Sequence, residues 1–220
     1  MTDVRRVLVV GATGVVGGLT AQLLAGRGAS LALAGRDPAR LADRARRLNG
    51  CPTATFEAYD LDRCTALASW AAEELGGLDA VVVTVGVAGF GTAEDVTNAA
   101  AEHLMTVNAL AAMAVVRGAL PVLRAAGTVA VVTGAIVDRP MRGTADYAAA
   151  KTALATWLRV VRREQLGYGV SVMDVRLPHL DTGFADRAVI GSPPVLPPGA
   201  DPATEVERLL VGPVMGLVAA

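Results

Sequence analysis

The chain has 220 residues, a formal net charge of −1 and only 4% aromatic residues, which suits one globular domain with a sizeable core. Its basic residues are dispersed, so the sequence predicts no surface for nucleic acid. No apolar run approaches the ~20 residues that span a bilayer, and we expect neither a membrane segment nor a targeting peptide. Cys51 and Cys64 lack the spacing of a metal site, which favours a reduced, cytoplasmic setting and no bound metal.

Short β-rich runs alternate with helical patterns along the chain. This alternation is typical of βαβ units around a parallel sheet that is buried on both faces. We therefore predict one Rossmann-type, doubly wound α/β domain of three layers over residues 1–220. The expected strands are residues 7–10, 31–34, 53–56, 80–84, 129–133 and 170–175. The expected helices lie near residues 17–26, 38–48, 64–75, 99–123, 147–166 and 203–210.

Two late segments are notable for their composition. Residues 191–202 are rich in proline and glycine and should form a loop, either over a site at the carboxyl ends of the strands or as a plain connector. Residues 209–220 are nearly all apolar but too short to span a membrane. We expect them to pack on the domain or on a second subunit.

Lys151 is the only lysine in the chain, and it stands four residues after Tyr147. Positions four apart share one face of a helix, so the phenol and the ammonium would project together. A nearby ammonium favours the phenolate and lowers a tyrosine pKa from its reference near ~10. Tyr147 is thus a candidate general acid or base, although a solvated helix face with this spacing by chance is an alternative interpretation.

A glycine-rich turn follows the first predicted strand and opens a helix. Glycine permits positive φ and close approach of the backbone to a ligand, and a helix N-terminus offers N–H groups to a pyrophosphate. The alternative is a tight turn that binds nothing, but the strand–turn–helix context favours dinucleotide binding. The residues expected to contact the cofactor here are Gly11, Thr13, Gly14, Val15, Val16 and Gly17.

The ends of the next two strands indicate which dinucleotide is bound. A site that prefers NAD usually has an acid at the end of the second strand, where this chain has Gly35 followed by Arg36. Arginine suits a 2′-phosphate, so NADP(H) is favoured over NAD(H), with a plain surface arginine as the alternative. Asp60, followed by Leu61, could meet the adenine amino group or cap the next helix.

With the glycine turn, Arg36, Asp60 and the Tyr147–Lys151 pair in this order, the chain resembles the short-chain dehydrogenase/reductase family over about residues 6–182. The resemblance implies an NADP(H)-dependent oxidoreductase that reduces a carbonyl, or oxidises an alcohol, of a small to medium organic substrate. Tyr147 would be its acid or base. Lys151 would bind the nicotinamide ribose and lower the tyrosine pKa.

The resemblance also implies further contacts and an assembly. Asn108 would hold a water of a proton relay, and Thr182 would hydrogen-bond the cofactor. Gly86 and Pro178 match cofactor-binding positions of the family. Members usually pair through the two long helices, so we expect a homodimer or homotetramer.

The chain departs from the family pattern at three places. The usual catalytic serine is replaced by Gly134, and Thr133 is the candidate substitute, although neighbours on a strand point to opposite faces. The family's Asn-Asn-Ala-Gly is Val-Thr-Val-Gly, in which Thr84 is a partial replacement for groups that brace the sheet. His179 follows the loop proline in place of glycine, and the usual C-terminal strand is missing.

These departures leave two other functions open. The missing serine motivates an enzyme of the same fold with non-redox chemistry, such as a dehydratase, isomerase or cyclase. A sensor that binds NADP(H) without turnover is the other, and the intact Tyr147–Lys151 pair argues against it. His179 is either a second acid/base or an ordinary loop histidine.

Overall fold

The computed structural model describes residues 5–216, except for the side chains of residues 124 and 125. Within this range one six-stranded sheet has the order β3-β2-β1-β4-β5-β6, and every pair of neighbours is parallel. The predicted doubly wound sheet is confirmed. Residues 217–220, the end of the predicted apolar tail, lie outside the described range. The strands are β1 (Arg6–Val10), β2 (Ser30–Gly35), β3 (Thr53–Thr55), β4 (Leu78–Val83), β5 (Leu123–Val132) and β6 (Ser171–Val175).

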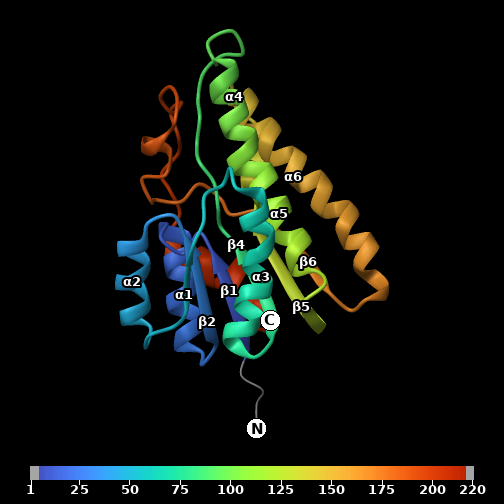
Figure 1. Cartoon of the computed structure of the whole chain (residues 1–220). Helices are drawn as coiled ribbons and strands as arrows, with labels where there is room; N and C mark the ends of the chain where they lie inside the picture. Colours follow the sequence, from blue (N-terminus) through green and yellow to red (C-terminus); the bar gives the residue numbers. More distant parts are fainter. Residues whose placement is uncertain (1–4, 217–220) are drawn as a thin grey trace.

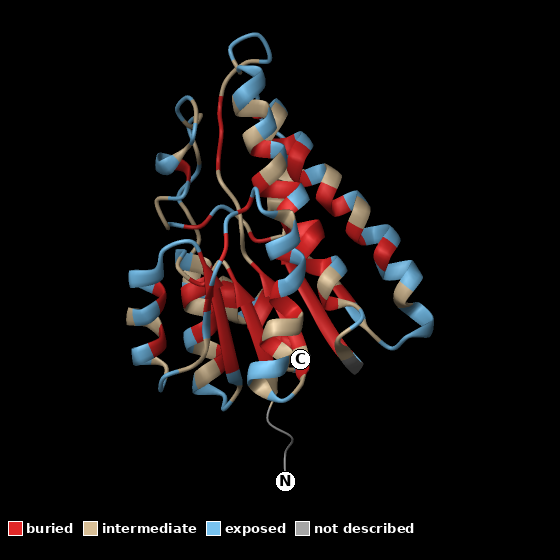
Figure 2. Cartoon of the chain, in the orientation of Figure 1, coloured by how far each residue is buried: buried red, intermediate tan, exposed pale blue. Residues whose placement is uncertain are grey.

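Helices cover both faces of the sheet, because successive strand residues face opposite sides. Leu8 and Val10 belong to the core on one face, whereas Val7 and Val9 belong to the core on the other. Figure 2 shows the strands buried between the two helical layers. The first face carries α3 (Leu61–Leu75), α5 (Ala111–Ala119) and α6 (Ala145–Glu164). The second carries α1 (Val15–Gly26), α2 (Pro38–Arg47), α7 (Pro202–Val206), η5 (Glu207–Val211) and α8 (Gly212–Val214).

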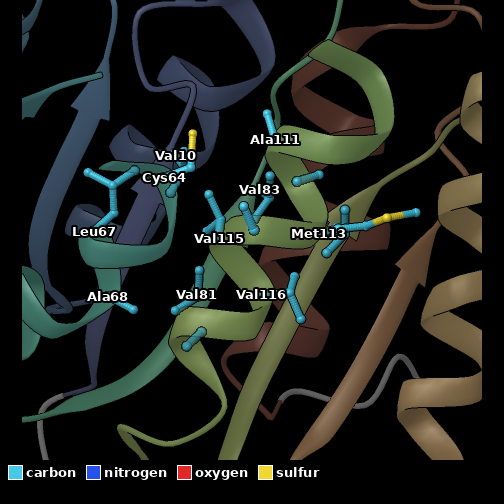
Figure 3. Packing of buried hydrophobic residues seen from close by; sticks show 14 of the residues in the cluster. Val10, Cys64, Leu67, Ala68, Val81, Val83, Ala111, Met113, Val115 and Val116 are labelled. Carbon is cyan, nitrogen blue, oxygen red and sulfur yellow. The ribbon is translucent and has the colours of Figure 1, made fainter. Parts of the chain in front are cut away.

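Close packing of α3 against α5 forms the centre of the larger core. Figure 3 shows Cys64 and Leu67 of α3 on the side of α5 that carries Val115, and Val81 of β4 belongs to the same cluster. The two helices approach so closely that a Cβ at Gly118 would overlap the carbonyl of Thr65. A glycine in this helix is therefore required by packing.

The long helix differs from its prediction. It consists of α4 (Asn98–Met105), a π-helical turn η1 (Thr106–Leu110) and α5, and it ends at Ala119 rather than at residue 123. Pro121 has no N–H to continue the helical hydrogen bonds, and Leu123 already begins β5. By length and composition the stretch Asn98–Ala119 could cross a membrane, but half of its apolar window is buried in the core. Packing in a core accounts for such apolarity.

The region above the carboxyl ends of the strands is built by two segments that are distant in sequence. Figure 1 shows α4 and the segment after β6 rising beyond this edge of the sheet. The N–H groups of Phe90 and Val189 donate to the carbonyls of Ile190 and Ala88, each at 2.9 Å. Ala185 packs with Ala88 and Phe90 in a small third cluster. Within residues 5–216 no seventh strand follows β6, as predicted.

Candidate active site

The glycine turn after β1 is held against the neighbouring strands. Gly11 has φ +91°, and its N–H donates to the carbonyl of Ala34 at 2.9 Å. A Cβ on either Gly11 or Gly17 would lie 2.6 Å from Thr84 Oγ1. The Thr84 hydroxyl donates to the Val10 carbonyl at 3.0 Å, so it braces β1 against the end of β4 as predicted. The turn therefore excludes side chains at both glycines.

The N-terminus of α1 fits the phosphates of a dinucleotide. Gly14, the N-cap of α1, has no side chain to accept from the first N–H groups of the helix, whereas the carboxylate of Asp37 accepts from the Arg40 N–H at the start of α2. Gly14 is exposed, and Val15 in the first turn is 43% exposed. The first N–H groups of a helix need acceptors and favour an anion. No carboxylate competes with a pyrophosphate at this helix end in the described part of the chain, so the residues present fit the group.

The second predicted cofactor region lies beside this turn. A Cβ at Gly35 would lie 2.9 Å from Thr13 Cγ2, so the glycine turn and the end of β2 are in contact. Arg36 follows at once and is exposed. Asp60 is also exposed, and its Oδ1 accepts the N–H of Arg63 at 2.8 Å as the N-cap of α3, where Leu61 is the first residue. Capping by Asp60 is thus observed, and its contact with adenine stays a prediction.

Lys151 lies inside the domain and is only 4% exposed. Its Nζ donates to the carbonyl of Val85 at 3.4 Å and to that of Val132 at 3.3 Å, at the ends of β4 and β5. A Cβ at Gly86 would lie 3.0 Å from this nitrogen, so glycine leaves room for it. Burial lowers the pKa of Lys151 to about 8, and the charge of Asp174 partly opposes this shift.

Asn108 is fully buried in the π-helical turn beside Lys151. Its Oδ1 accepts the N–H of Val87 at 3.1 Å, and its Nδ2 donates to the carbonyl of Val87 at 3.0 Å. A Cβ at Gly86 would also lie 3.0 Å from Asn108 Oδ1. Asn108 thus positions the backbone that borders Lys151. The structure brings these predicted residues together, and the water relay stays a prediction.

Tyr147 stands one helical turn before Lys151 on α6 and is half-buried. The ring of Phe184, from the segment after β6, lies against its ring with centroids 6.5 Å apart. Burial raises the pKa of Tyr147 to about 12. The expectation that Lys151 lowers this pKa is wrong for this structure, because loss of water around the phenol is the cause that acts.

The predicted substitute for the missing serine does not fill that role. Thr133 is 1% exposed, and its hydroxyl donates to Oδ1 of Asp174. The one proton of a hydroxyl cannot at the same time serve a substrate, so this prediction is corrected. Gly134 has φ +86° and ψ 160°, a backbone region that is essentially restricted to glycine. A serine at this position would therefore require a different backbone conformation.

The segment after β6 carries the remaining predicted contacts. Pro178 and Thr182 are half-buried, and the Thr182 carbonyl accepts a hydrogen bond from Arg187 Nη2 at 3.2 Å. A hollow of about 260 Å³ lies within this segment, and both His179 and Phe184 line it. Part of the predicted substrate-side loop borders the same hollow through Pro193, Pro194, Leu196 and Pro197. The structure thus places His179, Phe184 and part of the loop around one hollow, and the predicted cofactor contacts of Pro178 and Thr182 stay predictions.

Two residues of the site were missed by sequence reasoning. Phe184 covers Tyr147, and nothing in the sequence around it indicates this contact. Asp174 is a charged residue within the strand Ser171–Val175, and such a charge in a predicted buried strand was a usable signal. Its partner Thr133 was predicted for a different role.

A parallel sheet of this order, with a phosphate-binding turn after its first strand, defines a dinucleotide-binding domain. The short chain dehydrogenase family model matches residues 5–190, and the chain belongs to this family. The protein is therefore an NAD(P)-dependent short-chain dehydrogenase/reductase.

Solved structures agree with this assignment. A short-chain oxidoreductase of Thermus thermophilus is 30% identical with a TM-score of 0.80, and the match covers 98% of this chain and 96% of that one. An alcohol dehydrogenase of Thermococcus sibiricus, solved with 5-hydroxy-NADP, is 22% identical with a TM-score of 0.83 and coverages of 93% and 88%. A dehydrogenase/reductase of Sinorhizobium meliloti 1021 has 22% identity, a TM-score of 0.82 and coverages of 98% and 90%. No protein of curated function matches the chain.

Proposed function

We propose that the protein reduces a carbonyl group of a small to medium organic substrate with NADPH, and that Tyr147 supplies the proton. The observation that carries this proposal is geometric: Tyr147 stands one turn before Lys151 on α6, and Lys151 is buried against the carbonyls of Val85 and Val132. A general acid must hold its proton at the working pH, and Tyr147, with a pKa of about 12, does so throughout the neutral range. The same pKa leaves little phenolate at neutral pH to accept a proton in the oxidation of an alcohol.

The reaction divides between the chain and its cofactor. When bound, NADPH would supply the hydride that the carbonyl carbon receives. Tyr147 Oη gives its proton to the carbonyl oxygen as the electron pair of the C=O bond moves onto that oxygen, and an alcohol results. The ammonium of Lys151, one turn away on α6, would bind the nicotinamide ribose and so place the cofactor beside Tyr147. Phe184 keeps water from the proton donor.

The cofactor preference rests on charge at the end of β2. Arg36 is exposed directly after this strand, next to Gly35 and its neighbour Thr13. We expect the guanidinium to bind the 2′-phosphate that distinguishes NADP(H) from NAD(H). The first turn of α1 would receive the pyrophosphate, and Lys151 the nicotinamide ribose.

One observation favours a second function. Thr133 is bound to Asp174 and Gly134 has no side chain, so β5 offers the substrate oxygen no hydroxyl. Loss of a positioned donor costs ~10²–10³ in rate for reactions that need it. A non-redox reaction that uses Tyr147 alone does not need this donor, so it would not lose rate in this way. A sensor without turnover does not need the donor either.

The decisive experiment follows NADPH absorbance over a panel of aldehydes and ketones. We expect turnover on at least one class, and we expect Tyr147→Phe to abolish it while NADPH binding persists. NADPH binding without oxidation across the whole panel would instead support the non-redox enzyme or the sensor. Full activity of Tyr147→Phe would remove Tyr147 as the acid.

Assembly and location are also proposed. Val160 on α6, Met105 on α4 and Leu110 in η1 are 47%, 36% and 38% exposed, an apolar set on the long helices through which a homodimer or homotetramer would form. Light scattering at micromolar concentration tests this, and a monomer would contradict it. Free Cys51 and Cys64 suit a reduced cytoplasmic setting.

A further inference from the structure

A chain of polar contacts links the end of β5 to the loop before Tyr147. The hydroxyl of Thr133 donates to Asp174 Oδ1. Arg176 donates to Asp174 Oδ2 through Nε at 2.9 Å and Nη2 at 2.7 Å, and its Nη1 reaches Asp138 Oδ1 at 2.8 Å. The Asp174 side chain is 13% exposed, whereas that of Asp138 is 60% exposed. The inner carboxylate is therefore fixed in place from two sides.

This fixed carboxylate and the buried ammonium are hydrogen-bonded to two consecutive residues, the last residue of β5 and the residue after it. Lys151 Nζ donates to the carbonyl of Val132, and Asp174 accepts from the next residue, Thr133. Asp174 lies opposite Val131 in the parallel register of β5 and β6. The hydrogen-bond acceptors of Lys151 are two neutral carbonyls at 3.3 and 3.4 Å, which are long for a buried cation. A buried ammonium needs an opposite charge nearby to remain protonated.

We propose that Asp174 is the counter-charge of Lys151, a positioning residue that is oriented by Thr133 and Arg176 and keeps the ammonium protonated. The same contact explains why Thr133 does not replace the missing serine. Its hydroxyl, just after β5, donates to the carboxylate of Asp174 instead of to a substrate. The pairing of Asp174 with Lys151 does not depend on the proposed function. Only its consequence for catalysis rests on that function.

The electrostatics of the site agree with this pairing. Asp174 is the only charge within residues 5–216 that acts to raise the pKa of Lys151. The elements around the lysine carry other titratable or charged groups, and none of them acts in this way: Asp146 and Tyr147 on α6, Glu102 and His103 on α4, Asp138 in the loop before α6, and Arg176 after β6. Since Arg176 binds the same carboxylate, it should weaken the field that Asp174 exerts on the lysine.

The single lysine of the sequence makes the test direct. Protein labelled with [¹³C]lysine contains one labelled residue, so the chemical shift of its ε-carbon titrates Lys151 alone. We expect Asp174→Asn, which keeps the size of the side chain and an acceptor for Thr133, to lower the pKa of Lys151 by roughly one unit. Arg176→Gln should raise it, because the carboxylate is then no longer neutralised. Asp138→Asn is the matched control, and we expect it to leave the titration within about 0.3 units of wild type.

NADPH binding gives a second readout. With a pKa near 8, half of Lys151 is protonated at pH 8, and a fall of one unit leaves roughly a tenth. Asp174→Asn should therefore raise the Kd for NADPH about fivefold at pH 8 and hardly at pH 6. Circular dichroism checks that each variant is folded.

The outcomes are separable. An unchanged Lys151 titration in folded Asp174→Asn, or an equal fall in Asp138→Asn, overturns the pairing. Where Asp174→Asn does not fold, Arg176→Gln decides, and an unchanged or lower pKa overturns it. The titration is independent of turnover, so a protein without reductase activity would refute the proposed function and leave this result standing.

Discussion

The ring of Phe184 lies against the ring of Tyr147, with centroids 6.5 Å apart and planes tilted by 47°. Phe184 belongs to a segment that follows β6, whereas Tyr147 lies on α6. The acidity of the proposed proton donor therefore depends on how this segment packs. Its pairing with Ala88 and Phe90 holds the segment in place.

Phe184→Ala should return water to Tyr147 and lower its pKa from about 12 toward the ordinary value of 10.0. Phenolate absorbance during an alkaline titration measures this change, and comparison with Tyr147→Phe identifies the signal among the three tyrosines. Phe184→Leu keeps an apolar cover and should change the titration less. Identical titrations of wild type and Phe184→Ala would show that Phe184 does not control the phenol.

NADPH binding should weaken as the pH rises through 8. The pKa of Lys151 is lowered from 10.5 to about 8, so the lysine is charged below pH 8 and neutral above it. Between pH 7 and pH 9 its protonated fraction falls roughly tenfold, and we expect the Kd to rise by up to that factor. Fluorescence titration measures the Kd. Lys151→Met should bind weakly at both pH values, and a pH dependence that survives in this variant would assign the effect to another group.

Arg36→Ala should weaken NADPH binding roughly tenfold to a hundredfold, because a charge-assisted hydrogen bond contributes about 1.5–3 kcal/mol. The Kd for NADH, which lacks the 2′-phosphate, should change little. Arg46→Ala on α2 removes an exposed arginine from the helix that follows Arg36 and is the control. Equal losses for NADPH and NADH would refute the assignment of Arg36 to the 2′-phosphate.

Gly118→Ala should destabilise the fold, because a Cβ there overlaps the Thr65 carbonyl where α5 meets α3. Overpacking of this kind costs about 1–3 kcal/mol of unfolding free energy, which urea denaturation measures. Gly26 in α1 has open space around its Cβ position, so Gly26→Ala should be neutral or stabilising by about 0.5–1 kcal/mol. If both variants behave alike, the proposed helix contact is not the cause.

Restoring a serine should not restore the family's site. At Gly134 a Cβ would lie 3.8 Å from the Leu177 carbonyl, so space is available, but φ is +86°. Gly134→Ser and Gly134→Ala should therefore each lose about 1–3 kcal/mol of stability from backbone strain alone. Thermal unfolding with the two variants side by side checks this. A serine variant as stable as wild type would show that the backbone adapts.

Features that depend on a few neighbouring residues were predictable. The glycine turn and the shared face of Tyr147 and Lys151 each arise within one or two turns of chain. The sheet followed from alternating patterns because parallel strands must be buried on both faces. The end of the long helix was wrong because the apolar pattern continued into β5, and the effect of Pro121 was not taken into account.

The sequence alone therefore determined the family, the sheet and the residues that form the phosphate turn and the Tyr147–Lys151 pair. Only the tertiary structure decided the chemical state of that pair and the partner of Thr133. A pKa depends on all the water and charge around a group. Here burial raises the pKa of Tyr147, and the charge of Asp174, from the strand that follows α6, partly opposes the lowered pKa of Lys151. Such neighbours meet only when the chain is folded, so spacing along the sequence predicted that Lys151 would lower the pKa of Tyr147, whereas burial raises it.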